Sequence, residues 1–191
     1  EGDPLKLARK RTMTFFGSKL ICSSTPTLKG LSRVDDLWEK SDKRHLFVPC
    51  PDCGHHQILK WENVTWTKGR PETAGYACEA CGTVWSDADI KRQIRHCEWR
   101  ATAPFNRIAG FHVWQAYSPW STLANIVAEY EESEGKSAER QVWTNTVLGE
   151  VWDGDERANV TAQELYERRE SFADVQVPER AVVLTAGVDI Q

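Results

Sequence analysis

Two pairs of cysteines are the residues of this sequence whose type and spacing most clearly predict chemistry. Cys50 and Cys53 form one C-x2-C pair, Cys78 and Cys81 form a second, and 24 residues separate the pairs. A glycine follows the second cysteine of each pair, which allows the unusual backbone conformation of a tight turn. Two thiolates three residues apart on such a turn can face one ion. The spacing therefore predicts a four-thiolate zinc site on two knuckles, a zinc ribbon.

Two other kinds of cysteine chemistry compete with zinc. Disulfides would require an oxidising compartment, and the charged, interrupted start of the chain is no secretion signal. A redox C-x-x-C pair usually stands alone at the start of a helix. With four cysteines available as ligands, we expect His55 and His56 to be surface residues and Cys22 to be a buried small hydrophobe. A structural zinc site can contribute about 10 kcal/mol to folding, but a ribbon binds nucleic acid, binds protein or only stabilises a fold.

The elements that position these residues are expected to mix helices and strands. Helices are predicted over residues 3–15, 32–41, 86–96, 118–135, 137–149 and 161–170, from N-cap residues, a glycine stop and helical spacing of apolar residues. Strands are predicted at residues 19–22, 46–48, 58–61 and 83–85, with two more on either side of a turn at residues 104–106. The architecture is predicted to be mixed α and β, with a small β module inserted.

Length and composition indicate a globular chain. The 191 residues contain 40% hydrophobic and 27% charged residues and no apolar run long enough to cross a membrane. The chain starts without Met and ends just after an apolar stretch, so we expect it to be a segment of a longer protein. The net charge of −4 argues against a simple basic nucleic-acid binder, but the charge is uneven. Residues 1–45 carry 10 Lys and Arg against 6 Asp and Glu, whereas residues 101–191 carry 7 against 15.

One short motif imitates a phosphate-binding loop. Gly135, Lys136 and Ser137 end like such a loop, but Tyr130 stands where the motif needs its first glycine, and an acidic helix precedes it. We expect a helix–glycine–helix turn there.

Several segments, in order, resemble one protein family. The resemblance covers essentially the whole chain and is to the large terminase subunit of tailed bacteriophages, of the lambda-like type. The segments that carry it are EGDPLKLARKRTMTF, KLICSSTPTLKGLSRV, SDKRHLFVPCPDCGHHQILKWE, YACEACGTVW, GFHVWQAYSPW, NTVLGEVW and LTAGVDIQ.

The resemblance implies a place in a DNA-packaging motor that hydrolyses ATP, moves double-stranded DNA into a procapsid and cuts concatemeric DNA. Residues 1–45 would end a P-loop ATPase core, 46–100 would be the zinc-ribbon insert, 101–180 a connecting region that becomes helical, and 181–191 the first strand of a ribonuclease-H-like nuclease. The implied partners are double-stranded DNA, the small terminase subunit and the portal of the procapsid, with no membrane. The implied location is the host bacterial cytoplasm, transiently at the portal.

The family's functional positions fall on particular residues here. Ser23, Ser24 and Thr25 would form the coupling motif that senses the γ-phosphate of ATP. Asp189 would be the first nuclease carboxylate for Mg²⁺ or Mn²⁺. Candidate DNA contacts are the cations of the first segment, Lys6, Arg9, Lys10, Arg11, Lys19 and Lys29.

Not all of the machinery is present in this stretch. A complete phosphate-binding loop and the later nuclease carboxylates are missing, so this chain alone is expected neither to hydrolyse ATP nor to cut DNA. Two alternatives stay open from the sequence: a stand-alone zinc-ribbon adaptor that binds nucleic acid or protein without catalysis, and a thiol redox enzyme.

Overall fold

The computed structural model describes residues 3–153 together with residues 166 and 167. Residues Glu1–Gly154 form one compact unit, and a second unit spans Asp155–Gln191. In the second unit the two described residues are helical and exposed. The remainder of the helix predicted over residues 161–170 lies outside the described residues.

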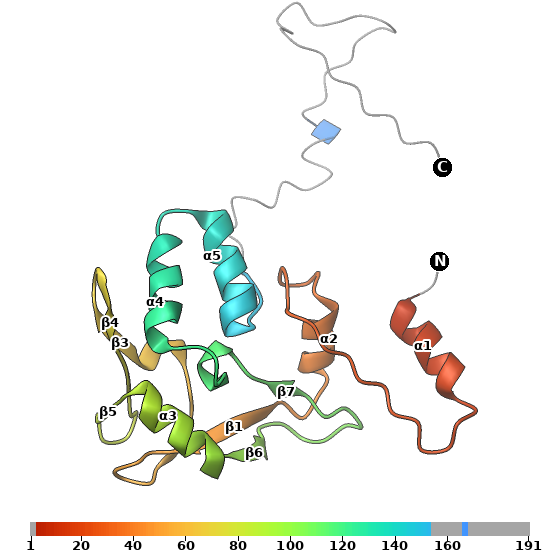
Figure 1. Ribbon diagram of the computed structural model, residues 1–191. Helices are drawn as coiled ribbons and strands as arrows, with labels where there is room; N and C mark the ends of the chain where they lie inside the picture. The colour runs from red at the N-terminus through yellow and green to blue at the C-terminus, as the bar shows by residue number, and fades with distance from the viewer. Residues whose placement is uncertain (1–2, 154–165, 168–191) are drawn as a thin grey trace, which may run out of the picture. The chain divides into compact units, whose positions relative to one another are not determined.

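The first unit combines short helices with two small antiparallel-rich sheets (Figure 1). Its α-helices are α1 (Pro4–Thr12), α2 (Arg33–Glu39), α3 (Asp87–Gln93), α4 (Leu123–Glu132) and α5 (Ser137–Trp143). Its strands are β1 (Arg44–Pro49), β2 (His56–Ile58), β3 (Val64–Thr67), β4 (Arg70–Ala77), β5 (Val84–Trp85), β6 (Glu98–Ala101) and β7 (Phe111–His112). Short 3-10 turns cover Trp61–Asn63, Ile94–His96 and Gln115–Tyr117, and a π-helical turn covers Thr144–Leu148.

β1 is the central strand of the larger sheet. β2 pairs antiparallel with the second half of β1 and β6 antiparallel with its first half, while β7 runs parallel to Arg44 and His45. The second sheet has the order β3-β4-β5 and is antiparallel throughout. The two strands predicted around residues 104–106 are therefore confirmed as β6 and β7, but both pair with β1, not with each other.

Asp42 explains why β6 and β7 do not form a hairpin. Its backbone carbonyl accepts hydrogen bonds from the N–H groups of Thr102 and Ala103, both at 3.1 Å, and its side chain accepts one from the N–H of Gly110 at 3.1 Å. The carboxylate also accepts a bond from Arg44 Nε at 2.7 Å and is fully buried. Burial raises the pKa of Asp42, but the hydrogen bonds from Arg44 and Gly110 outweigh it and hold the pKa below its ordinary value. One buried residue, Asp42, thus fixes both ends of the β6–β7 loop, one through its backbone carbonyl and the other through its carboxylate.

The hydrophobic core joins the sheets to α4. Leu46 and Val48 alternate with half-buried residues along β1, so one face of the sheet is buried. On α4, Leu123, Ile126 and Val127 recur at helical spacing and are at most 1% exposed. The predicted apolar face of this helix is confirmed.

The β3–β4 hairpin is an element that the sequence analysis missed. Lys68 and Gly69 form its two-residue loop, and Gly69 has φ 73°, a conformation that favours glycine. The alternation of β-branched and aromatic residues in β3 was the available signal. The region between the two cysteine pairs is therefore ordered secondary structure and not a long loop.

The N-terminal segment differs most from expectation. α1 forms as predicted, and the side chain of Asp3 accepts a hydrogen bond from the N–H of Leu5 at 3.0 Å. The strand predicted at residues 19–22 is not formed, and Cys22 is exposed, so its assignment as a buried residue was wrong. In the described part of the chain no strand pairs with residues 19–22, and a lone strand has no partner for its backbone groups. Ser32 precedes α2 as predicted but makes no capping bond through its side chain.

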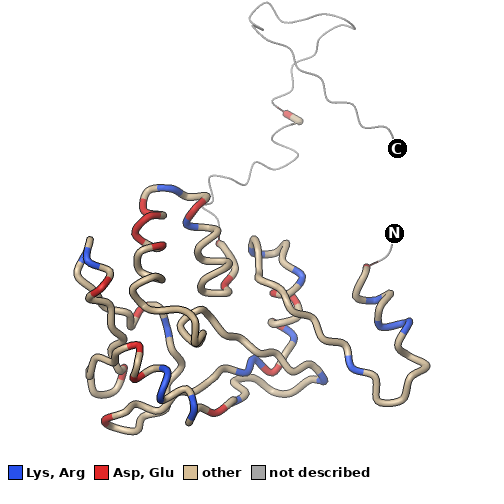
Figure 2. Tube along the Cα trace, in the orientation of Figure 1, with Lys and Arg blue, Asp and Glu red and all other residues tan. Residues whose placement is uncertain are grey.

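The glycine between α4 and α5 confirms the predicted turn. Gly135 has φ 76°, and Lys136 at the start of α5 bonds to Glu139 at 2.9 Å. Figure 2 shows acidic residues gathered on α4, which would repel phosphate. Among the described helices, none combines the length and apolar character needed to cross a membrane.

Candidate metal centre

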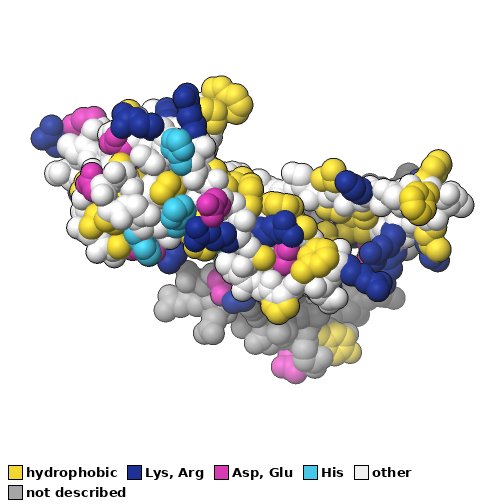
Figure 3. Space-filling view, turned by 90° about the horizontal axis from the view of Figure 1, so that it is seen from below, with side chains coloured by type: hydrophobic (Ala, Val, Ile, Leu, Met, Phe, Trp, Pro, Cys, Tyr) yellow, Lys and Arg dark blue, Asp and Glu magenta, His cyan; other side chains and the backbone are white. Residues whose placement is uncertain are grey.

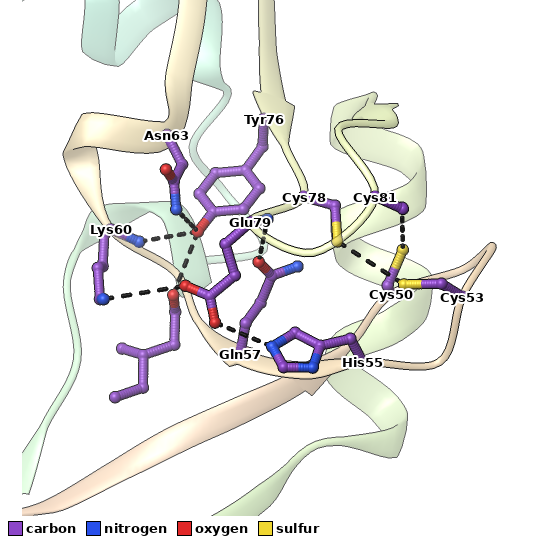
Figure 4. A network of polar contacts seen from close by, with 11 residues as sticks. Cys50, Cys53, His55, Gln57, Lys60, Asn63, Tyr76, Cys78, Glu79 and Cys81 are labelled. Atoms are coloured by element: carbon purple, nitrogen blue, oxygen red, sulfur yellow. Dashed lines mark hydrogen bonds and ion pairs between the residues drawn. The ribbon is translucent and has the colours of Figure 1, made fainter.

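The first cysteine knuckle lies between β1 and β2. The N–H of Gly54 donates to the carbonyl of Cys50 at 3.0 Å, and the N–H of Cys50 donates to the carbonyl of His55 at 2.9 Å. Gly54 has φ 71°, a left-handed conformation that a residue with a Cβ adopts only with strain. These bonds fold the chain back so that Cys53 and Cys50 face the same point (Figure 4).

The second knuckle, between β4 and β5, repeats the same backbone. The N–H of Gly82 donates to the carbonyl of Cys78 at 2.9 Å, and the N–H of Cys78 donates to the carbonyl of Thr83 at 2.9 Å. Gly82 has φ 75°. The glycine after each pair is therefore required by backbone geometry, as the sequence analysis predicted.

The four sulfur atoms meet between the two knuckles. All four Sγ atoms lie within 4.8 Å of one another, with Cys50 and Cys81 at 3.7 Å and Cys53 and Cys78 at 3.9 Å. A tetrahedron with metal–sulfur bonds of about 2.3 Å has sulfur–sulfur edges of about 3.8 Å. A disulfide would bring two sulfurs to about 2.05 Å, and all four cysteines are free. The sulfur positions fit a four-coordinate metal ion.

The four thiols influence one another's protonation. Hydrogen bonds from the side chain and backbone of Thr83 lower the pKa of Cys81 to about 6. The pKa of Cys53 is raised to about 12, because burial and the neighbouring thiols outweigh the favourable hydrogen bond from the backbone of His55. Thiolates this close repel one another, so all four can ionise together only beside a positive ion.

A second layer of polar contacts joins the knuckles. Gln57 is fully buried, and its side-chain oxygen accepts a hydrogen bond from the N–H of Glu79, between the second pair of cysteines, at 2.9 Å. The carboxylate of Glu79 contacts His55 Nε2 at 3.0 Å and Lys60 Nζ at 3.9 Å (Figure 4). His55 is exposed, as predicted, and contacts an acidic residue instead of taking a ligand position. The sequence analysis missed Gln57, because a glutamine next to two histidines gives no sign in the sequence that it will be buried.

Two buried tyrosines attach the ribbon to its surroundings. Tyr76 on β4 accepts bonds from the N–H of Lys60 and from Asn63, both at 3.1 Å, and donates to the carbonyl of Ile58 at 3.1 Å. Tyr117 accepts a bond from the N–H of Leu59 at 3.0 Å and donates to a carbonyl of β1 at 3.0 Å. The ribbon is therefore tied both internally and to the segment after β7.

The hairpin of the ribbon also contacts α4. Glu131 Oε1 accepts bonds from the indole of Trp66 at 2.9 Å and from the N–H of Gly69 at 2.8 Å. Lys68 at the hairpin loop pairs with Glu134 at 2.8 Å. These three contacts hold the β3–β4 hairpin against α4 and the turn that follows it.

The predicted coupling residues do not lie at a strand end. Ser23, Ser24 and Thr25 are exposed in an irregular segment, and the hydroxyl of Ser24 donates to the carbonyl of Thr25 at 2.9 Å. Pro26 directly after them is buried. Asp189 lies outside the described residues.

The predicted DNA-contact residues are all exposed. Lys29 forms an ion pair with Asp153. The other five, of which four lie on α1, have no acidic partner among the described residues; they are Lys6, Arg9, Lys10, Arg11 and Lys19. Figure 3 shows Lys and Arg side chains among exposed hydrophobic ones on one face of the molecule.

Comparison with known proteins connects these features to one family. The sequence profile of the phage terminase large subunit gpA, ATPase domain, matches residues 1–99, and that of the terminase large subunit gpA, endonuclease domain, matches residues 108–191. The large terminase subunit of Escherichia phage lambda is 31% identical over all of this chain, and that of Enterobacteria phage P21 is 30% identical. The chain spans 33% of the length of each of these relatives. No solved structure matches it significantly.

The two profiles together cover nearly the whole sequence, and the predicted resemblance is confirmed. The chain belongs to the gpA family of phage terminase large subunits.

Proposed function

We propose that this chain is part of a viral DNA-packaging motor that hydrolyses ATP, moves double-stranded DNA into a procapsid and cuts concatemeric DNA. The observation that carries the proposal is the succession of an ATPase-domain match and an endonuclease-domain match along one chain. A stand-alone adaptor would need neither, so that alternative is not favoured. The complete motor would act in the host bacterial cytoplasm, with the small terminase subunit and the portal of the procapsid as partners.

In this proposal residues 1–45 end a P-loop ATPase core. Ser23, Ser24 and Thr25 sense the γ-phosphate of ATP or its attacking water, and loss of that contact after hydrolysis shifts the segment. Their exposure beside a buried Pro26 supports this role, because their side chains can reach a neighbouring surface while the residue that follows them is buried.

Residues 181–191 supply the first strand of a ribonuclease-H-like nuclease. Asp189 holds one of two Mg²⁺ or Mn²⁺ ions, which when bound would stabilise the attacking and leaving oxygens of a phosphodiester. One carboxylate alone cannot form a two-metal site, because each ion needs several oxygen ligands, so we expect this segment alone to be inactive.

The four cysteines bind one Zn²⁺ with a structural role. The thiolate-only donor set favours zinc, and the sulfur separations of 3.7 and 3.9 Å support tetrahedral binding. The ribbon of residues 46–100 then forms a stable support for the connecting region of residues 101–180.

DNA contacts the first segment through its candidate cations, of which Lys29 is already paired with Asp153. Replacing Lys6, Arg9, Lys10, Arg11 and Lys19 with Ala should flatten the salt dependence of DNA affinity, because each lost phosphate contact reduces the slope by about 0.9. An unchanged slope would exclude this surface.

The activity test uses the complete polypeptide that carries this chain. ATP hydrolysis and cutting of double-stranded DNA are measured with Mg²⁺ for the unmodified protein, Asp189→Ala and the control Asp36→Ala, an exposed residue of α2. We expect Asp189→Ala to lose cutting while keeping ATP hydrolysis, and Asp36→Ala to keep both. Cutting that survives Asp189→Ala would reject the nuclease assignment, and DNA binding without either activity would favour the adaptor.

A further inference from the structure

The segment that follows the coupling residues is joined to the end of the helical region. Leu28 forms a parallel β-bridge with Trp152, and the N–H of Trp152 donates to the carbonyl of Thr27 at 2.9 Å. The N–H of Lys29 donates back to the carbonyl of Trp152 at 3.1 Å, and its side chain pairs with Asp153. We call these contacts between residues 27–29 and 152–153 the coupling bridge.

Asn145 completes the coupling bridge from inside. Its amide nitrogen donates to the carbonyl of Thr27 at 3.0 Å and to the carbonyl of Glu150 at 2.8 Å. The side chain is only 8% exposed, so both of its N–H groups form these hydrogen bonds in an environment that is largely shielded from solvent. The Thr27 carbonyl thus receives two donors, one from Asn145 and one from Trp152.

The backbone around Asn145 is unusual. It lies in the π-helical turn Thr144–Leu148, which ends at Gly149 with φ 66°. Such turns are rare in proteins, and those that do occur are frequently found at functional sites. Here the turn places one amide between two backbone segments that are more than a hundred residues apart in sequence.

The coupling bridge lies between the coupling residues on one side and the residues that lead into the second unit on the other. Ser23, Ser24 and Thr25 are exposed, and Thr25 precedes the bridge by two residues. In the part of the chain that the structure describes, no hydrogen bond joins these three residues to the helical region. Asp153 ends the described part of the first unit, and the second unit starts at Asp155. A displacement of residues 23–25 would therefore be transmitted through Thr27 to the segment that leads into the second unit.

We propose that Asn145 is a positioning residue that transmits movement of the nucleotide-sensing segment to residues 150–153, and so connects the ATP state of the motor to its nuclease unit. This inference rests on the proposed function, because it takes residues 23–25 as the coupling motif. Asn145 contacts neither nucleotide nor DNA in this account; it acts through the backbone of Thr27 and Glu150.

The test is hydrogen–deuterium exchange of the complete polypeptide, with and without a non-hydrolysable ATP analogue and Mg²⁺. Asn145→Asp keeps the shape of the side chain but removes both N–H donors. Asn125→Asp, an exposed position on α4, makes the same change of charge and serves as the control. Trp152→Pro removes the other donor to Thr27 and replaces the first variant should Asn145→Asp not fold.

In the unmodified protein and in Asn125→Asp, the analogue should change exchange in both residues 19–27 and residues 150–153. In Asn145→Asp the response of residues 19–27 should remain, while that of residues 150–153 should fall by roughly fivefold or more, the effect of losing at least one hydrogen bond. Two outcomes would overturn the inference alone. In the first, the response of residues 150–153 survives in both Asn145→Asp and Trp152→Pro. In the second, residues 19–27 of the unmodified protein respond to the analogue but residues 150–153 do not. No response at residues 19–27 in the unmodified protein would overturn the proposed coupling role and the inference with it.

Discussion

The carboxylate of Glu131 on α4 accepts a hydrogen bond from the indole N–H of Trp66 at 2.9 Å, across 65 residues of sequence. The same oxygen binds the N–H of Gly69 in the hairpin loop. The pKa of Glu131 is held below its ordinary value, first by the bond from Gly69 and then by that from Trp66. The ribbon is thus docked on the helical region by a carboxylate that is anionic at neutral pH.

Removing that carboxylate should loosen the hairpin. In Glu131→Ala the donors of Trp66 and Gly69 lose their acceptor, so we expect the melting temperature to fall by several degrees and the hairpin amides to exchange faster. Glu132→Ala, the next residue of α4 and exposed, should do neither. Equal melting temperatures for the two variants would show that Glu131 does not dock the ribbon.

Tyr117→Phe tests the attachment of β1 to the segment after β2. The change removes one hydroxyl, which accepts a hydrogen bond from the N–H of Leu59 and donates one to a carbonyl of β1. Because both partners are buried, the free energy of unfolding should fall by about 1–3 kcal/mol. Tyr130→Phe is the matched control, because no hydrogen bond of the Tyr130 hydroxyl is seen among the described residues, and it should change stability by less than about 0.5 kcal/mol. Urea unfolding of both variants measures the difference, and a similar cost for both would contradict the assigned role of the Tyr117 hydroxyl.

The raised pKa of Glu150 should make the stability of the fold depend on pH. Glu150 is exposed as a whole, but partial burial of its carboxyl raises the pKa of that group; nearby His112 opposes this shift and Glu62 adds to it. Because the folded pKa exceeds the unfolded one, the charged group destabilises the fold fully above the folded pKa and not at all below the unfolded value of about 4.3. Glu150→Gln should therefore raise the free energy of unfolding at neutral pH, and the gain should shrink as the pH falls towards that value.

The control for this measurement is Glu132→Gln, which removes the same charge from an exposed position of α4. The free energy of unfolding is measured for each variant and the unmodified chain at several pH values. A gain in Glu150→Gln that does not change with pH would contradict burial of the charge as its cause.

The six cysteines should separate into two groups. Serine at any of Cys50, Cys53, Cys78 or Cys81 should abolish tight metal binding and lower the melting temperature strongly, because three thiolates leave a coordination position open. Serine at Cys22 or Cys97 should leave both unchanged, since neither belongs to the sulfur cluster. Metal binding that is lost on changing Cys22 or Cys97 would contradict the assigned ligand set.

Much of the site could be predicted from local sequence. The knuckles follow from cysteine spacing and glycine, and α4 follows from the period of Leu123, Ile126 and Val127, because these signals depend on residues close together in the chain. The turn at Gly135 could be separated from a phosphate loop for the same reason.

The features that could not be predicted depend on distant partners. The strand expected at residues 19–22 has suitable residues but no described neighbour to pair with. Asp42, Gln57 and Asn145 are ordinary polar residues in the sequence, and only the fold brings their partners to them. Sequence pattern therefore located the four clustered cysteines but not the polar contacts around the knuckles, at the β6–β7 loop and in the N-terminal segment.

Native mass spectrometry of the chain before and after treatment with a strong chelator, with melting curves of both samples, tests the zinc ribbon most directly. We expect one tightly bound Zn²⁺ per chain, and after its removal an apoprotein that has lost most of its cooperative melting, because about 10 kcal/mol of metal binding contributes to folding. A metal-free chain that melts at the same temperature, or a mass lowered by the hydrogens lost in disulfide formation, would contradict the four-thiolate site.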